Sequence, residues 1–391
     1  VEEMASDAGI NELDDSAILK WSNGLTEPHH LVRNVRRASW DDQKTSRLHK
    51  DAAMTWSLLD GHRARKLEAH HRSMSGKEED IQWIESNIQQ IALSDSASAA
   101  VVLENALESK ESQILREEAA TIALDRGERI EAGIHIDKIN EVLPRKIFES
   151  RLARLNGNQT LAEKLEAEVI TLSEPSQRAK MEVSSIIRRF DDRLPGRLGN
   201  SESDKILQII SQVDLGAISN DERESATLSL ELVKYSIALS DSNIQEASKS
   251  RAEIESRLAL DDNFLEILDL KARLSSRVNG ASSNSSISWS KDFISSLDEP
   301  VTRILAIHST LEAVGKEFPD WLIEAHRESC GYPLREDVPS IRRLSAHRWY
   351  WRGLLDPVNR MSHWTEAISR FRAAECINAA NQLVTKMAKG S

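Results

Sequence analysis

The most constraining feature of the sequence is a repeated spacing in which a glycine or serine is followed five residues later by an alanine. Small side chains at this spacing let two antiparallel helices approach closely after a turn. The spacing therefore predicts helical hairpins. Its five copies are Ser94 and Ala99, Gly127 and Ala132, Gly157 and Ala162, Ser242 and Ala247, and Ser362 and Ala367.

Three of these copies continue with further apolar residues four and seven positions after the alanine. Steps of four and three keep side chains on one face of a helix, so these residues are expected to fill the groove beside the alanine. Pro144 then blocks the continuation of its helix and begins the next unit. The residue pairs are Leu103 and Ala106, Ile136 and Ile139, and Phe371 and Ala374.

The composition supports a chain that is mostly helical. Its 391 residues include only 15 glycines and 9 prolines, both of which are unfavourable inside helices. Only 3 tyrosines and 6 phenylalanines are present, which disfavours a large β-sheet. With 40% hydrophobic residues, the chain can bury a sizeable core. Near the N-terminus, the segment 14–21 is expected to open a short helix.

The segments IALDRGERIEAGIHIDKINEVLP and WIESNIQQIALSDSASAAVVLENAL carry most of the pattern of the tetratricopeptide repeat family, which the chain resembles. The resemblance is clear over 80–175 and patchier over 222–258 and 345–378. It implies an all-α fold, a helical-hairpin α-solenoid with flanking helical regions. Arg251 and Pro357 depart from the pattern, and an irregular helical bundle with coincidental alanine spacing is the alternative.

Four regions are predicted along the chain. Residues 1–78 form a basic, His-rich helical region, and residues 79–278 form the helical-repeat array. Residues 279–288 are Ser-rich and are predicted to be a linker, while residues 289–391 form a Trp-rich helical region with one possible hairpin. Tryptophan follows this division, because four of the nine lie before residue 84 and five lie from Trp289 onward.

A basic strip over residues 29–77 contains eleven Lys and Arg residues against five Asp and Glu, in a chain with a net charge of −12. It also holds six of the eleven histidines. The strip is either a contact surface for nucleic acid or an acidic partner, or an ordinary solvated helix face. The residues selected as partner-binding candidates are Arg33, Arg36, Arg37, His62, Lys66 and His70.

A second candidate is the segment RRLSAHRWYWRG at 342–353, where arginine alternates with aromatic residues. Arg348, Trp349 and Trp351 suit base stacking or peptide docking, but tryptophan also fills wide gaps between helices, and the packing interpretation is favoured. The pairs Glu27 with His30 and Glu68 with His71 have the spacing of helical di-iron ligands, although Pro28 makes the first pair a poor helical motif.

These patterns predict a non-enzymatic interaction or scaffold protein that binds a protein or peptide partner through a helical-repeat surface. In such arrays the concave surface is built from the first helix of each hairpin. The alternative is a nucleic-acid-associated regulator that uses the basic strip. Common nucleotide-binding and hydrolase motifs are absent from the sequence, and no catalytic, cofactor or metal site is assigned. Two cysteines and no long apolar stretch favour a cytoplasmic protein that does not enter a membrane.

Overall fold

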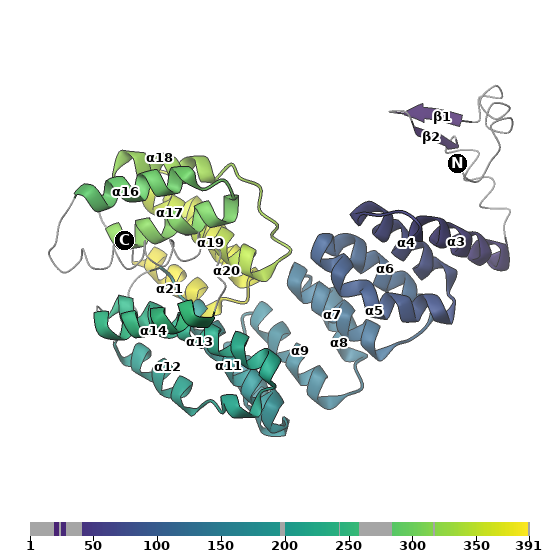
Figure 1. Ribbon diagram of the computed structural model, residues 1–391, viewed down its shortest axis with the longest axis horizontal. Coiled ribbons are helices and arrows are strands. Elements are labelled where there is room, and N and C mark those ends of the chain that lie inside the picture. Colours follow the sequence, from purple (N-terminus) through teal and green to yellow (C-terminus); the bar gives the residue numbers. More distant parts are fainter. Residues whose placement is uncertain are drawn as a thin grey trace. The chain divides into compact units, whose positions relative to one another are not determined.

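The computed structural model describes residues 19–22, 25–28, 41–195, 200–241, 243–257, 284–315 and 317–389. Over these residues the chain is helical apart from one β-hairpin, and eighteen α helices pack mostly as consecutive pairs (Figure 1). The chain divides into two compact units, a first unit of Val1–Ala119 and a second unit of Ala120–Ser391.

Of the short helix expected over residues 14–21, residues 19–21 belong to a β-hairpin instead, and residues 14–18 lie outside the described residues. Strands β1 (Leu19–Ser22) and β2 (Leu25–Pro28) are antiparallel, and Ser22 is the register partner of Leu25. The sequence Asn-Gly stands between the two strands and is the strongest short-range signal for such a hairpin. Apolar periodicity alone could not detect it in so short a segment.

The first unit contains the helical part of the basic strip. Two helices, α3 and α4, occupy this part. Gly61, at φ 100°, stands immediately before the second of them. The helices are α3 (Asp42–Ser57), α4 (His62–Ser75), α5 (Glu78–Ser94), α6 (Ser96–Ser109) and α7 (Gln113–Arg126), the last of which continues into the second unit.

The second unit contains most of the hairpins. Proline occupies the first turn of α11, α17 and α19, where its missing N–H leaves no hydrogen bond unmade. The central elements are α8 (Arg129–Asp137), α9 (Val142–Leu155), α10 (Gln159–Leu172), α11 (Pro175–Asp191), α12 (Asn200–Gln212), the 3₁₀ helix η1 (Leu215–Ala217), α13 (Asn220–Ser240) and α14 (Ile244–Arg257).

Six helices form the C-terminal part of the second unit. The first of them starts at Asn284, inside the Ser-rich segment 279–288 that was predicted to be a linker, and residues 279–283 lie outside the described residues. The predicted boundary between residues 78 and 79 lies within the first unit. The helices are α16 (Asn284–Ser296), α17 (Pro300–Val314), α18 (Asp320–Ser329), α19 (Pro339–Leu355), α20 (Arg360–Ala373) and α21 (Ile377–Ala388).

The alanines of the repeated spacing all lie in the core, as predicted. Ala132, for example, packs with Ile136 and Ile139 in one buried cluster, and the same cluster includes Leu124 from the preceding helix. The prediction of helical hairpins is therefore confirmed. The five buried alanines are Ala99, Ala132, Ala162, Ala247 and Ala367.

Three hairpins share the same turn, in which one residue adopts a left-handed conformation. Gly127 and Gly157 both have φ 77°, and Glu375 has φ 61°. In each turn this residue's N–H bonds to the carbonyl three residues back, and the next N–H bonds to the carbonyl five residues back. This is the Schellman arrangement, which satisfies the last carbonyls of the helix.

Glu375 marks a hairpin that the sequence pattern did not reveal. Five residues after it stands Ala380, which is buried between α20 and α21 in the position of the other alanines. By contrast, Ser362 was expected at a turn but lies inside α20, because that helix already begins at Arg360. The search for Gly or Ser at the turn therefore missed the hairpin at Glu375. It also placed the turn before α20 at Ser362, which is too far along the chain.

Replacing Gly157 by alanine is expected to lower the free energy of unfolding by about 1–2 kcal/mol, because a Cβ atom is disfavoured in the left-handed conformation. No atom lies within 4 Å of the added methyl, so the effect isolates backbone strain. Gly127→Ala should behave similarly. Gly133→Ala is the control, because Gly133 lies inside α8 and the change should stabilise by about 0.5–1 kcal/mol. Urea unfolding measures all three, and equal effects at Gly157 and Gly133 would contradict the turn geometry.

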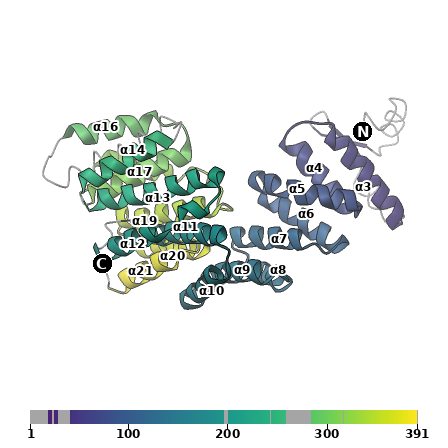
Figure 2. The ribbon, with the colours of Figure 1, turned by 60° about the horizontal axis from the view of Figure 1, so that its bottom comes forward.

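The structure does not confirm a simple solenoid, in which each repeat contacts only its neighbours. Arg342 of α19 donates to the carbonyl oxygens of Asp125 and Ala373. Arg151 of α9 donates to the carboxylates of Asp125 and Glu375. The C-terminal helices therefore pack against hairpins about two hundred residues earlier, and Figure 2 shows yellow helices beside teal ones in this unit.

A second contact of this kind fixes the start of α21. The carboxylate of Asp192, which follows α11, accepts hydrogen bonds from the backbone N–H groups of Asn378 and Ala379 at 3.0 and 2.9 Å. A carboxylate at this position compensates the unpaired N–H groups at the start of a helix. Asp192 thus caps a helix that lies far from it in the sequence.

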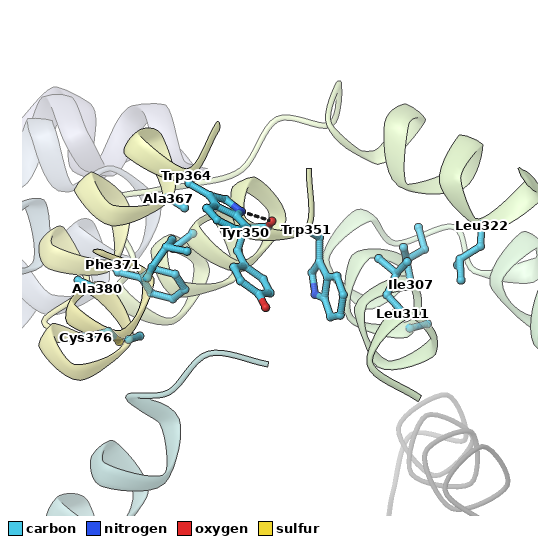
Figure 3. Packing of buried hydrophobic residues seen from close by; sticks show 14 of the residues in the cluster. Ile307, Leu311, Leu322, Tyr350, Trp351, Trp364, Ala367, Phe371, Cys376 and Ala380 are labelled. Carbon is cyan, nitrogen blue, oxygen red and sulfur yellow. Dashed lines mark hydrogen bonds between the residues drawn. The ribbon is translucent and has the colours of Figure 1, made fainter. Parts of the chain in front are cut away.

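The largest core cluster of the second unit is formed by side chains of the C-terminal helices (Figure 3). Its aromatic centre consists of Tyr350, Trp364 and Phe371, with Ala367 and Ala380 allowing the helices to approach. The indole N–H of Trp364 donates to the carbonyl oxygen of Tyr350 at 3.2 Å. Trp351 and Trp364 belong to this core and Trp321 and Trp349 pack against it, which accounts for four of the five tryptophans after residue 288.

Candidate functional site

The candidates from the basic strip fall into two groups. Arg33, Arg36 and Arg37 lie outside the described residues. His62, Lys66 and His70 lie on α4 at intervals of four residues, which places them on one side of the helix as expected. His62 is exposed, whereas Lys66 and His70 are partly buried.

Three cations of the strip are paired with acidic groups of the first unit. The ammonium group of Lys66 lies 2.8 Å from a carboxylate oxygen of Asp95, and this hydrogen bond lowers the pKa of Asp95. Lys50 pairs with Glu79 at 2.8 Å. Arg72 lies 2.5 Å from Asp80. Because these cations already have counterions, the strip offers a polyanion less charge than its composition suggests.

Three histidines of the strip lie close together between α3 and α4. The Nδ1 atoms of His49 and His71 are 2.9 Å apart, and the ring of His70 lies 5.3 Å from that of His71. Glu68 does not complete a Glu-x-x-His ligand pair with His71, since its carboxylate accepts from Arg72. Within the described ranges, no set of three or more His, Cys, Asp and Glu side chains is placed to hold a metal ion.

The arginine and tryptophan candidates on α19 have different environments. Arg348 is buried, and its guanidinium donates to the carbonyl oxygens of Ser329 and Tyr332 at 3.0 Å each. Trp351 is buried in the C-terminal core. These contacts favour the packing interpretation for both residues. Trp349 is partly exposed.

The environment of Trp349 is cationic. The guanidinium groups of Arg352 and Arg370 lie 5.0 and 5.6 Å from the centre of its ring. Arg370 also pairs with Glu336 and Glu366, so one of the two cations is neutralised within the fold. Trp349 remains the only one of the three α19 candidates with a side chain that is not fully buried.

Three exposed apolar residues on α8 and α9 are a candidate that the sequence reasoning missed. Ile130 is 83% exposed and Ile134 is 45% exposed, one helical turn further on. Val142, at the start of α9, is 62% exposed. We call these three residues the α8–α9 apolar surface. A signal for it existed, because Ile130 and Ile134 stand three and seven residues after Gly127, off the face that Ala132 and Ile136 bury.

By its fold, the chain belongs to the general class of helical-hairpin proteins, since its helices pack mostly as consecutive pairs. Comparisons with protein-family models, with curated proteins and with solved structures found no match. In the part of the chain that the structure describes, none of the helices combines the length and apolar content required to span a membrane.

Proposed function

We propose that the protein is a non-enzymatic interaction protein that binds a protein partner through the α8–α9 apolar surface. The observation that carries the proposal is the exposure of Ile130, Ile134 and Val142 on helices whose other faces are well packed. Covering apolar side chains of this size is favourable by about 25 cal/mol for each Å² removed from water. A partner with complementary apolar side chains would supply that cover.

The location of this surface changes the expectation taken from the repeat family. Ile130 and Ile134 lie on the second helix of the hairpin around Gly127, whereas a concave repeat surface is built from first helices. The proposed contact therefore uses the second helix of the hairpin. It needs no catalytic group and no cofactor.

The nucleic-acid regulator is the weaker candidate. Lys50, Lys66 and Arg72 are engaged by carboxylates of the first unit, and the chain as a whole carries a net charge of −12. A polyanion would have to compete with these ion pairs. The two functions differ in salt dependence, because phosphate contacts weaken steeply as salt rises and apolar contacts do not.

Affinity capture from the source cells tests the proposal. The wild-type protein is expected to retain a protein partner at both 150 and 500 mM salt, and the double substitution Ile130→Lys and Ile134→Lys should remove it by placing two charges in the contact. Val358→Lys is the matched control, since Val358 is also highly exposed but lies between α19 and α20.

The comparison of variants decides the outcome. A partner that is lost with the α8 variant and kept with Val358→Lys supports the proposal. A partner that binds the α8 variant as well as the wild type, or that dissociates between 150 and 500 mM salt, contradicts it. Circular dichroism of both variants verifies that the helices are intact.

A further inference from the structure

The β-hairpin of the first unit has two outer edges. Among the residues that the structure describes, the sheet consists of β1 and β2 alone, so each strand has a neighbour on one side only. The outer edge of such a strand carries backbone N–H and C=O groups that can pair with another strand. A hairpin of two strands is only marginally stable by itself in water, and a third strand beside it would stabilise it.

The register of the hairpin determines which backbone groups point outwards. Ser22 and Leu25 flank the two-residue loop, so these two residues exchange both of their backbone hydrogen bonds. Such pairs alternate along an antiparallel ladder, and the next one is Lys20 with Glu27. The backbone groups of the other four strand residues therefore point to the outer edges. These residues are Leu19 and Trp21 on β1, and Thr26 and Pro28 on β2.

The two outer edges differ in the groups that they offer. The edge of β1 has both an N–H and a carbonyl oxygen at Leu19 and at Trp21. The edge of β2 has both groups at Thr26 but only a carbonyl oxygen at Pro28, because proline has no backbone N–H. Proline on an edge strand obstructs the addition of another strand. An added strand is therefore expected beside β1.

The residue types of β1 indicate which strand it would accept. Successive residues alternate between the two faces of a sheet, so Leu19 and Trp21 belong to one face and Lys20 to the other. Apolar residues opposite Leu19 and Trp21 would extend the first face, and an acidic residue opposite Lys20 would form a favourable cross-strand pair. A second copy of β1 with Leu19 opposite Trp21 would instead place two lysines directly opposite each other, which is unfavourable.

We propose that β1 binds an extended segment of a partner protein in which an acidic residue stands between two apolar residues. The segment adds to the hairpin as an antiparallel third strand, with its acidic residue opposite Lys20. Backbone hydrogen bonds supply the affinity, and the alternating residues supply the selectivity. The hairpin belongs to the first unit and the α8–α9 apolar surface to the second, so this proposal does not depend on the proposed function.

The test is a titration of a fluorescein-labelled peptide, Thr-Val-Glu-Val-Thr, with the full chain, followed by fluorescence polarisation. We expect a dissociation constant on the order of 100 µM. Methylating the backbone nitrogens of both valines removes the two N–H groups that face β1, and binding should weaken about tenfold or more. Methylating the backbone nitrogen of the glutamate is the matched control. Its N–H faces away from β1, so binding should be nearly unchanged.

Substitutions in the hairpin test which edge the peptide uses. Trp21→Pro removes an outward N–H of β1 and should weaken binding about tenfold or more, whereas Trp21→Val keeps this N–H and should weaken it less. Thr26→Pro is the matched control, because Thr26 is the register partner of Trp21 but its outward N–H lies on the edge of β2. This variant should bind the peptide like the wild type.

An exchange of charges tests the chemistry of the partner. The double substitution Lys20→Glu and Glu27→Lys keeps opposite charges at one register pair. It should bind the peptide Thr-Val-Lys-Val-Thr about fivefold more tightly than the glutamate peptide, and the wild type should show the opposite preference.

Three results would overturn the proposal. The first is no binding of the glutamate peptide at a protein concentration about five times the expected dissociation constant. The second is an equal loss of binding with Trp21→Pro and Thr26→Pro. The third is a wild-type dimer that Trp21→Pro converts to a monomer in analytical ultracentrifugation, since a second copy of the chain would then occupy the edge of β1.

Discussion

Replacing Trp364 by alanine is expected to lower the free energy of unfolding of the second unit by about 3–5 kcal/mol. Trp364 is 1% exposed and is among the largest fully buried side chains of the described residues. Its ring is stacked on Tyr350, with the ring centres 6.3 Å apart, and its N–H donates to the Tyr350 carbonyl oxygen. Alanine removes this packing and leaves a cavity between α19 and α20.

The same contact predicts an effect at Gly353. A Cβ atom on Gly353 would overlap Cδ1 of Trp364, so Gly353→Ala forces the indole or the helix to move. We expect a loss of about 1–3 kcal/mol from overpacking, although alanine is otherwise the better helix former. In a Trp364→Leu background the clash is gone, and the same substitution should be almost neutral.

Urea unfolding of the single and double variants measures this coupling. Trp349→Ala serves as the control, because Trp349 is on the same helix but only partly buried, and its loss should be smaller. If Gly353→Ala is as stable as the wild type, the close approach of α19 and α20 at this position is wrong.

The second large effect is a loss of stability in mild acid. The rings of His308 on α17 and His326 on α18 lie 5.8 Å apart, with Arg348 and Cys330 nearby. Burial lowers the pKa of His308 well below its usual value and that of His326 to about 4. In the unfolded chain both regain a pKa of about 6.5.

The sign of the effect follows from these pKa shifts. Below pH 6.5 the unfolded chain binds protons that the folded chain does not, so the stability present at neutral pH is lost as the pH falls towards 4. Each histidine should contribute a loss of about 2 kcal/mol at pH 5 relative to pH 7.5. The double substitution His308→Gln and His326→Gln should remove most of this loss, whereas His62→Gln, at an exposed position, should not.

Thermal or urea unfolding at pH 7.5, 6 and 5 checks this prediction. The wild type should weaken steadily over the series, and the double variant should lose much less. Identical pH dependence in the two proteins would mean that the two rings are not buried as described.

The helical hairpins were predictable because they depend on local sequence. The side chain must be small at positions such as 132 and 162, where the two helices of a hairpin cross, and alanine stands at both. The spacing of these alanines is therefore visible without any knowledge of the remaining chain. The turn at Glu375 was not predictable in this way. A glutamate in the left-handed conformation is unusual, and here it is accompanied by an ion pair with Arg151, 224 positions earlier.

The packing of distant helices also escaped the sequence pattern. Arg342 and Asp192 stabilise the C-terminal helices through contacts with Asp125 and with the start of α21. A count of charges identifies such residues as basic or acidic but does not reveal their partners. For the same reason, Lys66 was selected for its place in the basic strip, although it pairs with Asp95.

A photo-crosslinking amino acid at position 134 tests most directly the claim that the α8–α9 apolar surface binds a protein. Ile134 is partly exposed, so the substitution disturbs little packing. We expect a covalent adduct with a protein when the probe is at 134, and none with the same probe at the control position 358. If position 134 yields no adduct, or if the probe at the exposed Arg63 of the basic strip crosslinks to nucleic acid instead, the account is contradicted.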